Sequence, residues 1–210
     1  MFASVPPVTR LLLIANIAVF IVQQYADDSL IILFALWPFG APAYTGSQTP
    51  AGFLPWQLVT YSFLHGNGLH LLVNMLGLYM FGSEVERVLG YRRYISYYFV
   101  SVLAAAIAQL VMSAMAGGPP YPTVGASGGV FGLLLAYGMF FPRRMVMLIF
   151  PPIPMPARVF VFVYAAIELY LGVTGTQAGV AHFAHLGGML GAFLMIQWRR
   201  GKPPFAKRRR

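Results

Sequence analysis

Three polar side chains that could carry out acid–base chemistry lie within otherwise apolar stretches of this chain. Ser127 stands in the segment GASGG at 125–129, and His70 and His185 lie in two other apolar stretches. A histidine can take the proton of a serine hydroxyl, and polar donors can stabilise the oxyanion that forms after the serine attacks a carbonyl group. Glycines on both sides of a serine let the backbone turn sharply and expose its hydroxyl. These residue types are the parts that acyl-transfer catalysis requires.

The elements that must hold these side chains are membrane-spanning helices. The chain has 210 residues, of which 59% are hydrophobic and 9% are charged, whereas soluble domains carry about 25% charged residues. This composition excludes a soluble enzyme and a disordered chain, and it favours a polytopic membrane protein. We therefore predict an all-α fold, a single membrane domain over 1–210 with six transmembrane helices, at about 11–24, 58–81, 94–115, 126–141, 159–173 and 180–198.

The basic residues predict how these helices are oriented. If Arg10 lies on the inner side, all 14 Lys and Arg residues fall on that side, which is the positive-inside pattern and gives an N-in, C-in topology. The inner segments are 82–93, 142–158 and the basic tail 199–210. The outer segments are 25–57, 116–125 and 174–179. The strong charge bias suits a bacterial inner membrane.

Several shorter segments have distinctive sequences. Leu30–Phe39 is apolar and aromatic but too short to span a bilayer, so we expect it to lie in the membrane interface. The segment 116–125 is rich in glycine and proline and is expected to be an exposed turn, while FPPIPMP at 150–156 cannot form a helix interior. No clear small-x-small cleavage site follows the first span, which favours an uncleaved signal anchor.

Residue counting places the three reactive side chains at one depth. Ser127 lies 16 residues before the inner charge Arg143, or about 24 Å at about 1.5 Å per residue. His70 and His185 each lie 14 residues from an inner charged residue, or about 21 Å. Because the hydrocarbon core is about 30 Å thick, the shared level is roughly 6–9 Å below the outer surface. We therefore expect a small polar site just beneath the outer face.

Glycines at helical spacing favour close packing of the helices that carry Ser127 and His185. Gly125 and Gly128 frame the serine, and glycines four residues apart occur at 125/129, 128/132 and 187/191. Such faces let helix backbones approach closely in a membrane. Packing the span 126–141 against the span 180–198 would bring the serine and the histidine within reach of each other.

The remaining polar residues in the spans are expected to be structural. Glu168 lies 10 residues from Arg158, or about 15 Å, which places it deeper than His185. By this count it falls short of the hydrogen-bond reach that an orienting carboxylate needs, so we expect it to be protonated or paired inside the bundle. His182 lies nearer the outer surface and is expected to be structural or solvent-facing, and His65 is expected to be structural.

The sequence predicts neither a metal site nor a cofactor. It has no cysteine, which excludes disulfides, thiolate ligands and a cysteine nucleophile. His65 and His70 are five residues apart rather than the four of a helical zinc motif. His182 and His185 share a helix face, but no third ligand is evident.

Three segments together resemble the rhomboid intramembrane serine proteases. They are GASGGVFG at 125–132, HGNGLHLLVN at 65–74 and AHLGG at 184–188. The stretch EVERVLG at 84–90 is also similar to the family's pattern. The resemblance covers most of the chain, from about Trp56 to Met195.

The resemblance implies a role for each matching residue. Ser127 would be the nucleophile and His185 the general base of a Ser–His dyad. His70, Asn74 and the Ser127 N–H would bind the oxyanion. Phe131 occupies a position where some members carry a tyrosine packed against the catalytic histidine.

The sequence departs from the family pattern at two places. Gln57 follows Trp56 where many members have arginine, and we expect this change to loosen the anchoring of the outer loop. Val88 stands where some relatives have a basic residue.

The function that this reading predicts is hydrolysis of peptide bonds in or next to transmembrane helices. The partners would be transmembrane protein substrates and membrane lipid. Nucleic acid is not expected, because the basic residues sit at the ends of spans and no aromatic residues interleave with them. Three alternatives stay open: a catalytically silent rhomboid-like protein that binds transmembrane helices, a small-solute transporter, and a structural scaffold.

Overall fold

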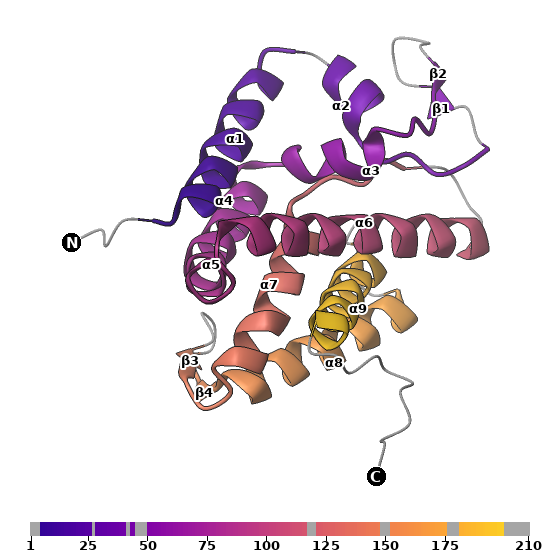
Figure 1. Ribbon diagram of the computed structural model, residues 1–210. Coiled ribbons are helices and arrows are strands. Elements are labelled where there is room, and N and C mark those ends of the chain that lie inside the picture. Colours follow the sequence, from indigo (N-terminus) through magenta and orange to yellow (C-terminus); the bar gives the residue numbers. More distant parts are fainter. Residues whose placement is uncertain are drawn as a thin grey trace.

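The structure, a computed structural model, is built mainly of helices (Figure 1). It describes residues 5–26, 28–40, 43–44, 50–116, 121–147, 152–175 and 181–199. The helices are α1 (Pro7–Gln23), α2 (Ser29–Phe34), α3 (Gln57–Thr60), α4 (Gly68–Gly77), α5 (Ser83–Leu89), α6 (Tyr91–Ala116), α7 (Ser127–Phe140), α8 (Ala157–Thr174) and α9 (His182–Arg199). Two short antiparallel ribbons pair β1 (Ala43–Tyr44) with β2 (Pro50–Ala51), and β3 (Met145–Met147) with β4 (Pro154–Pro156). The helical fold expected from the sequence is confirmed.

Two helices of the described part are long and apolar enough to cross a membrane. They are Tyr91–Met115 within α6 and Ala157–Thr174, while Pro7–Gln23 and Ser127–Phe140 are apolar but shorter. Large apolar side chains are exposed on the outer faces of the helices. Phe162, for example, is 75% exposed and Trp198 is 74% exposed. Such faces suit a lipid environment. The six-span arrangement and the N-in, C-in topology remain predictions.

The second apolar stretch is not one continuous helix, contrary to the prediction for 58–81. The chain forms α3 and a 3₁₀ turn at Tyr61–Phe63, then leaves the helical path and re-enters it at Gly68. Asn67 caps the new helix, because its side-chain oxygen accepts a hydrogen bond from the His70 N–H at 2.8 Å. From there α4 continues through a π-helical turn at Leu78–Gly82 into α5.

A buried carboxylate joins α5 to the start of α1. Glu86, which is 3% exposed, accepts hydrogen bonds from the Val8 N–H at 3.0 Å and the Thr9 N–H at 2.7 Å. The Thr9 hydroxyl also donates to Glu86, at 2.7 Å. The first N–H groups of a helix have no partner within it, and a negative charge there is favourable. This role explains a glutamate in the EVERVLG stretch.

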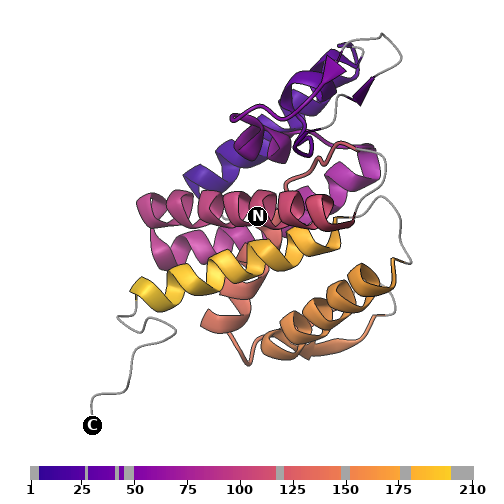
Figure 2. The same cartoon turned by 90° about the vertical axis from the view of Figure 1, so that its right-hand side faces the viewer.

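The helices that carry the predicted site pack through glycine. A Cβ added at Gly188 of α9 would lie 2.9 Å from the Gly128 carbonyl carbon of α7, below the 3.0 Å that Cβ contacts respect. The predicted contact between these two helices is therefore confirmed. Gly187 and Gly191, however, face Ala104 and neighbouring residues of α6, not α7. Both views show α9 next to α6, and Figure 2 shows the two helices running in similar directions (Figures 1 and 2).

Ion pairs and a short ribbon hold the segments on the expected inner side. Glu84 of α5 pairs with Arg87 and, at 2.6 Å, with Arg144, which precedes β3. The hydrogen bond and charge of Arg144 hold the pKa of the Glu84 carboxyl below its ordinary value. Pro154–Pro156 forms β4, so the expectation that this proline-rich segment is not helical is confirmed for these residues. Residues 150 and 151 of the segment lie outside the described part.

The outer segment is anchored by Gln57, contrary to the expectation that this residue loosens it. Its side chain is fully buried, and its oxygen accepts hydrogen bonds from the Trp37 N–H at 3.2 Å and the Leu54 N–H at 3.1 Å. Its amide nitrogen donates to the Gly52 carbonyl at 3.1 Å and, more weakly, to that of Leu33 at 3.4 Å. An amide supplies both donors and acceptors, so it satisfies backbone groups of both kinds.

The other segments singled out in the sequence are described in part. Within 30–39, α2 is followed by a buried Trp37 and an exposed Phe39, so this apolar patch is partly folded inward. Residues 117–120 of the expected turn and residues 200–210 of the basic tail lie outside the described residues.

Candidate active site

Ser127 is the first residue of α7, and the chain reaches it through a turn that needs glycine. Gly125 has a φ of 128°, which side chains rarely adopt, and its N–H donates to the Tyr61 carbonyl at 3.0 Å. Ala126 occupies the cap position, with no side-chain capping bond, so the Ser127 hydroxyl is not used to cap the helix. The Ser127 side chain is partly exposed, while Gly125 and Gly128 beside it are buried.

His185, in the first turn of α9, contacts this serine directly. Its Nε2 lies 2.8 Å from Ser127 Oγ. The imidazole is buried and stacks on the Phe131 ring, with centroids 4.3 Å apart and an interplanar angle of 5°. The expected meeting of Ser127 and His185 is therefore confirmed, and so is the packing of Phe131 against the histidine.

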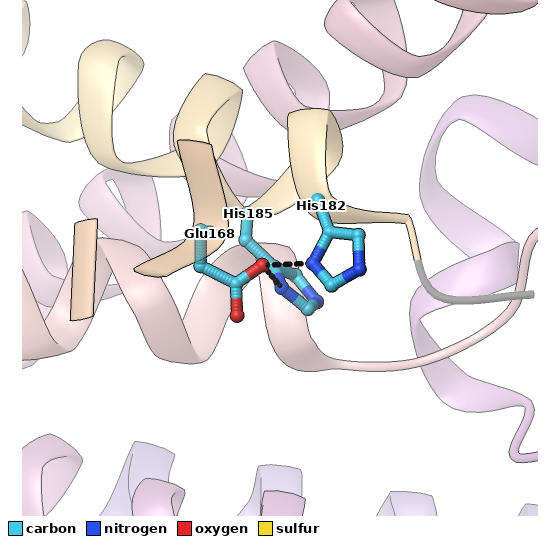
Figure 3. A group of neighbouring side chains, drawn as sticks. All are labelled: Glu168, His182 and His185. Carbon is cyan, nitrogen blue, oxygen red and sulfur yellow. Dashed lines mark hydrogen bonds and ion pairs between the residues drawn. The ribbon is translucent and has the colours of Figure 1, made fainter. Parts of the chain in front are cut away.

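Glu168 lies at the other side of the same imidazole, which contradicts the depth estimate. Its Oε2 is 2.8 Å from His185 Nδ1, within hydrogen-bond reach (Figure 3). Residue counting measures length along a helix axis and equals depth only if the helices are parallel. Figure 1 shows α7, which carries Ser127, and α8, which carries Glu168, running in clearly different directions, so counts along these two helices do not define one level. The expectation that Glu168 is paired inside the bundle is confirmed.

His182 shares this carboxylate oxygen. Its Nδ1 lies 2.7 Å from Glu168 Oε2, and the side chain is 5% exposed, so it does not face solvent. Its Nε2 is buried and has no hydrogen-bond partner among the described residues. Figure 3 shows Glu168 extending from α8 toward both imidazoles of α9.

His70 lies next to the serine, and Asn74 lies one helical turn further along α4. A Cβ built on Gly125 would be 2.8 Å from His70 Nε2 and 3.6 Å from Ser127 Oγ, so both atoms border the same small space. Asn74 is buried, and its side-chain nitrogen donates to the His70 carbonyl at 3.0 Å. The oxyanion roles of His70 and Asn74 remain predictions.

His65 is fully buried and contacts neighbouring aromatic rings. Its ring centroid lies 5.1 Å from that of His70 and 6.5 Å from that of Phe20. Gln23 of α1 bonds the His65 backbone on both sides, accepting from its N–H at 3.1 Å and donating to its carbonyl at 2.8 Å. These contacts suit the structural role expected for His65.

The cluster of Glu168, His182 and His185 could also hold a divalent cation. Their ligand atoms all lie within 4.8 Å of one another. Glu168 is thus the third potential ligand that the sequence did not make evident. The nitrogen–oxygen separations of 2.7 and 2.8 Å are those of hydrogen bonds, and zinc ligands at about 2.0–2.1 Å from the metal would stand further apart than this in a tetrahedral site.

The chain is similar in sequence to known proteins of one family. The Rhomboid domain family model matches residues 53–200. The chain is 31% identical over 140 residues to "Rhomboid protease GluP" of Bacillus subtilis (strain 168), covering 66% of this chain and 25% of that protein. It is 34% identical over 142 residues to "RHOMBOID-like protein 4" of Arabidopsis thaliana, covering 67% and 33%. It is 30% identical over 139 residues to "Rhomboid protein 1, mitochondrial" of Saccharomyces cerevisiae, covering 64% and 39%. The chain thus matches between a quarter and two fifths of the length of these relatives.

Proposed function

Because the chain belongs to the rhomboid family, whose members are integral membrane proteins, we propose that it is an intramembrane serine protease. Ser127 is the proposed nucleophile and His185 the proposed general base. One observation carries the proposal: Ser127 Oγ lies 2.8 Å from His185 Nε2, close enough for direct transfer of the hydroxyl proton. The resemblance of one relative to this chain adds support, because its name identifies it as a protease.

The proposed reaction is acyl transfer through the serine. Ser127 Oγ attacks the carbonyl carbon of the scissile peptide bond while its proton passes to His185 Nε2. The tetrahedral intermediate collapses, the carbon–nitrogen bond breaks, and His185 returns the proton to the leaving amine. Water then attacks the acyl-enzyme with His185 again as the base, which releases the second product and restores the serine.

Three donors are proposed to stabilise the oxyanion of the tetrahedral intermediate. The Ser127 N–H begins α7, where it has no partner within the helix and where the helix dipole favours negative charge. His70 is the second proposed donor, because its Nε2 lies against Gly125 and borders the same space as the Ser127 hydroxyl. Asn74 uses its amide nitrogen for the His70 carbonyl, and the second hydrogen on that nitrogen remains available.

The proposed substrates are transmembrane helices of other membrane proteins. A helix in lipid bonds its own carbonyl groups, so a substrate must unwind locally before a carbonyl can reach Ser127. Segments with glycine, proline or polar residues should therefore be preferred, with small side chains near the scissile bond. We place the reaction near the outer face of a bacterial inner membrane, with lipid as the surrounding partner and without cofactor, metal or nucleic acid.

The test is cleavage by the purified protein of a panel of single-span substrates in detergent. Ser127→Ala and His185→Ala are each expected to abolish cleavage while melting like the wild type. Ser101→Ala is the matched control, since it removes a buried hydroxyl that bonds the Tyr97 carbonyl in α6 and lies against Gly132, five residues beyond Ser127 on α7. A fluorophosphonate probe should label the wild type and not the Ser127 variant. Retained cleavage by Ser127→Ala would overturn the mechanism, and a wild type that neither cleaves nor reacts with the probe would point to a silent helix-binding protein.

A further inference from the structure

Beyond the two proposed catalytic residues, the chain holds a buried carboxylate to which the mechanism above gives no role. We propose that Glu168 is a positioning residue that extends the dyad to a Ser127–His185–Glu168 triad, held in place by His182. The inference rests on the proposed function of Ser127 and His185. It adds Glu168 and His182, which lie outside the motifs that carry the family resemblance. Ser127, His185, Glu168 and His182, from three helices, then form one continuous hydrogen-bonded row, of which Figure 3 shows His185, Glu168 and His182.

Glu168 favours the tautomer of His185 that a general base needs. To accept the serine proton, Nε2 must be unprotonated, which requires the ring hydrogen to be on Nδ1. Glu168 Oε2 lies 2.8 Å from that Nδ1. A carboxylate oxygen can only accept, so this contact favours the tautomer in which Nδ1 donates and Nε2 is free for Ser127.

Phe131 and Glu168 together fix the orientation of the His185 ring. Stacking on Phe131, at 4.3 Å and 5°, fixes the plane of the His185 imidazole. A half-turn of the ring about its bond to Cβ leaves that plane unchanged, but it moves both nitrogens away from their partners. The Glu168 contact stabilises only one of these two orientations, the one that directs Nε2 toward Ser127. Phe131 and Glu168 therefore constrain different motions of the same ring.

Glu168 also offsets the positive charge that forms on His185 during the proposed reaction. When His185 takes the serine proton it becomes a cation in a buried site, where His185 and Glu168 are each only 8% exposed. An unpaired charge is costly in such a place, and an adjacent carboxylate offsets that cost. Glu168 thus stabilises the imidazolium that forms with the tetrahedral intermediate, without exchanging a proton itself.

A hydrogen bond from His182 keeps the Glu168 carboxylate in place. Its Nδ1 lies 2.7 Å from the same Oε2 that bonds His185. A buried carboxylate with one donor could rotate its oxygens, whereas two donors from the first turn of α9 hold Oε2 between them. His182 acts through Glu168, as an orienting partner one step further from the reacting atoms.

The kinetic test compares Glu168→Gln with Glu86→Gln. Both remove a buried carboxylate by the same isosteric change, and the Glu86 carboxylate of α5 bonds the start of α1 rather than a residue of the proposed site. We expect Glu168→Gln to lower kcat by about 10²- to 10⁴-fold with KM changed less than about threefold, as loss of an orienting carboxylate does in a serine triad. Glu86→Gln should lower the melting temperature without lowering kcat of the folded fraction. Wild-type kcat in Glu168→Gln, while Ser127→Ala is inactive, overturns the triad and leaves the proposed function standing.

A spectroscopic test on the wild-type protein is independent of turnover. The ¹⁵N shifts of the wild-type imidazoles, assigned by single His→Gln variants, should report a hydrogen on Nδ1 and none on Nε2 of His185. The opposite tautomer overturns the proposal. Loss of wild-type activity with EDTA and its recovery with Zn²⁺ would also overturn it, because the cluster would then be a metal site. Equal cleavage with and without EDTA is the expected result.

Discussion

Replacing Gly188 with alanine tests whether the serine and histidine depend on direct backbone contact between two helices. Gly188 lies one turn after His185 on α9, and Gly128 follows Ser127 on α7. An added Cβ would lie 2.9 Å from the Gly128 carbonyl carbon, 3.2 Å from its Cα and closer still to its oxygen. These are backbone atoms, so no side chain can rotate away to make room.

The magnitude follows from the contact that must be relieved. Cβ contacts below 3.0 Å are essentially never seen, so α7 and α9 must separate locally by about 1 Å, and overpacking of this kind costs about 1–3 kcal/mol of stability. The hydrogen bond between Ser127 Oγ and His185 Nε2, now 2.8 Å, would lengthen by a similar amount. A misplacement of about 1 Å can lower turnover about 10²-fold.

The assay is cleavage of a single-span substrate, with a melting curve for each variant. Gly187→Ala is the matched control, because its Cβ would meet Ala108 and, at 2.9 Å, the Ala104 carbonyl of α6. That change separates α9 from α6 rather than from α7. We expect both variants to lose stability, but only Gly188→Ala to lose turnover of the folded protein by about 10²-fold. Wild-type turnover in folded Gly188→Ala would refute the reasoning.

Two further predictions concern residues outside the site. Gln57→Ala should remove about 2–4 kcal/mol from the free energy of unfolding, measured by denaturation in detergent, because it leaves buried backbone groups of the outer segment without partners; an unchanged stability would show that Gln57 anchors nothing. Glu84→Gln should lower stability by less than about 1 kcal/mol at pH 7, since the pair with Arg144 is partly exposed. Because Arg144 holds the pKa of Glu84 below its ordinary value, the difference between wild type and variant should be full above about pH 4.3 and should vanish as the pH falls through the lowered folded pKa. A difference that grows in acid would contradict this sign.

The contact between Ser127 and His185 was predictable because local sequence signals determine it. A serine among glycines at a helix start, a histidine near the start of another helix, and glycines on both faces indicate two backbones in contact. Four of the predicted spans match α6, α7, α8 and α9 to within a few residues, since long apolar runs bounded by charge or glycine predict helix ends well.

The break before α4 could also have been predicted from the sequence, but the predicted span 58–81 missed it. Gly66, Asn67 and Gly68 combine residues that favour turns with an N-cap, and the structure uses Asn67 in that way. Hydropathy alone hides such a break, because the residues on both sides of it are apolar. Length was the misleading signal: 58–81 contains enough residues to span, but they belong to two helices.

The two buried glutamates show what spacing along one chain cannot predict. Each accepts hydrogen bonds from another helix: Glu86 of α5 from the start of α1, and Glu168 of α8 from the first turn of α9. Which donors they meet depends on the relative directions of helices, and no periodicity within a single helix encodes that direction. In lipid, apolar side chains gain little by leaving the solvent for a neighbouring helix, so polar bonds at defined positions have more influence on which helices pair.

The position of α8 therefore affects the proposed chemistry. The bond that draws α8 toward α9 ends on the same carboxylate oxygen that directs His185 toward Ser127. A change that displaced α8 would therefore disturb the histidine even if Ser127, His185 and Phe131 were untouched. Stability and turnover should then fall together for substitutions along the α8–α9 contact, whereas substitutions around Glu86 should affect stability alone. The two buried carboxylates thus provide an internal comparison between a bond that only joins helices and one that also orients the proposed base.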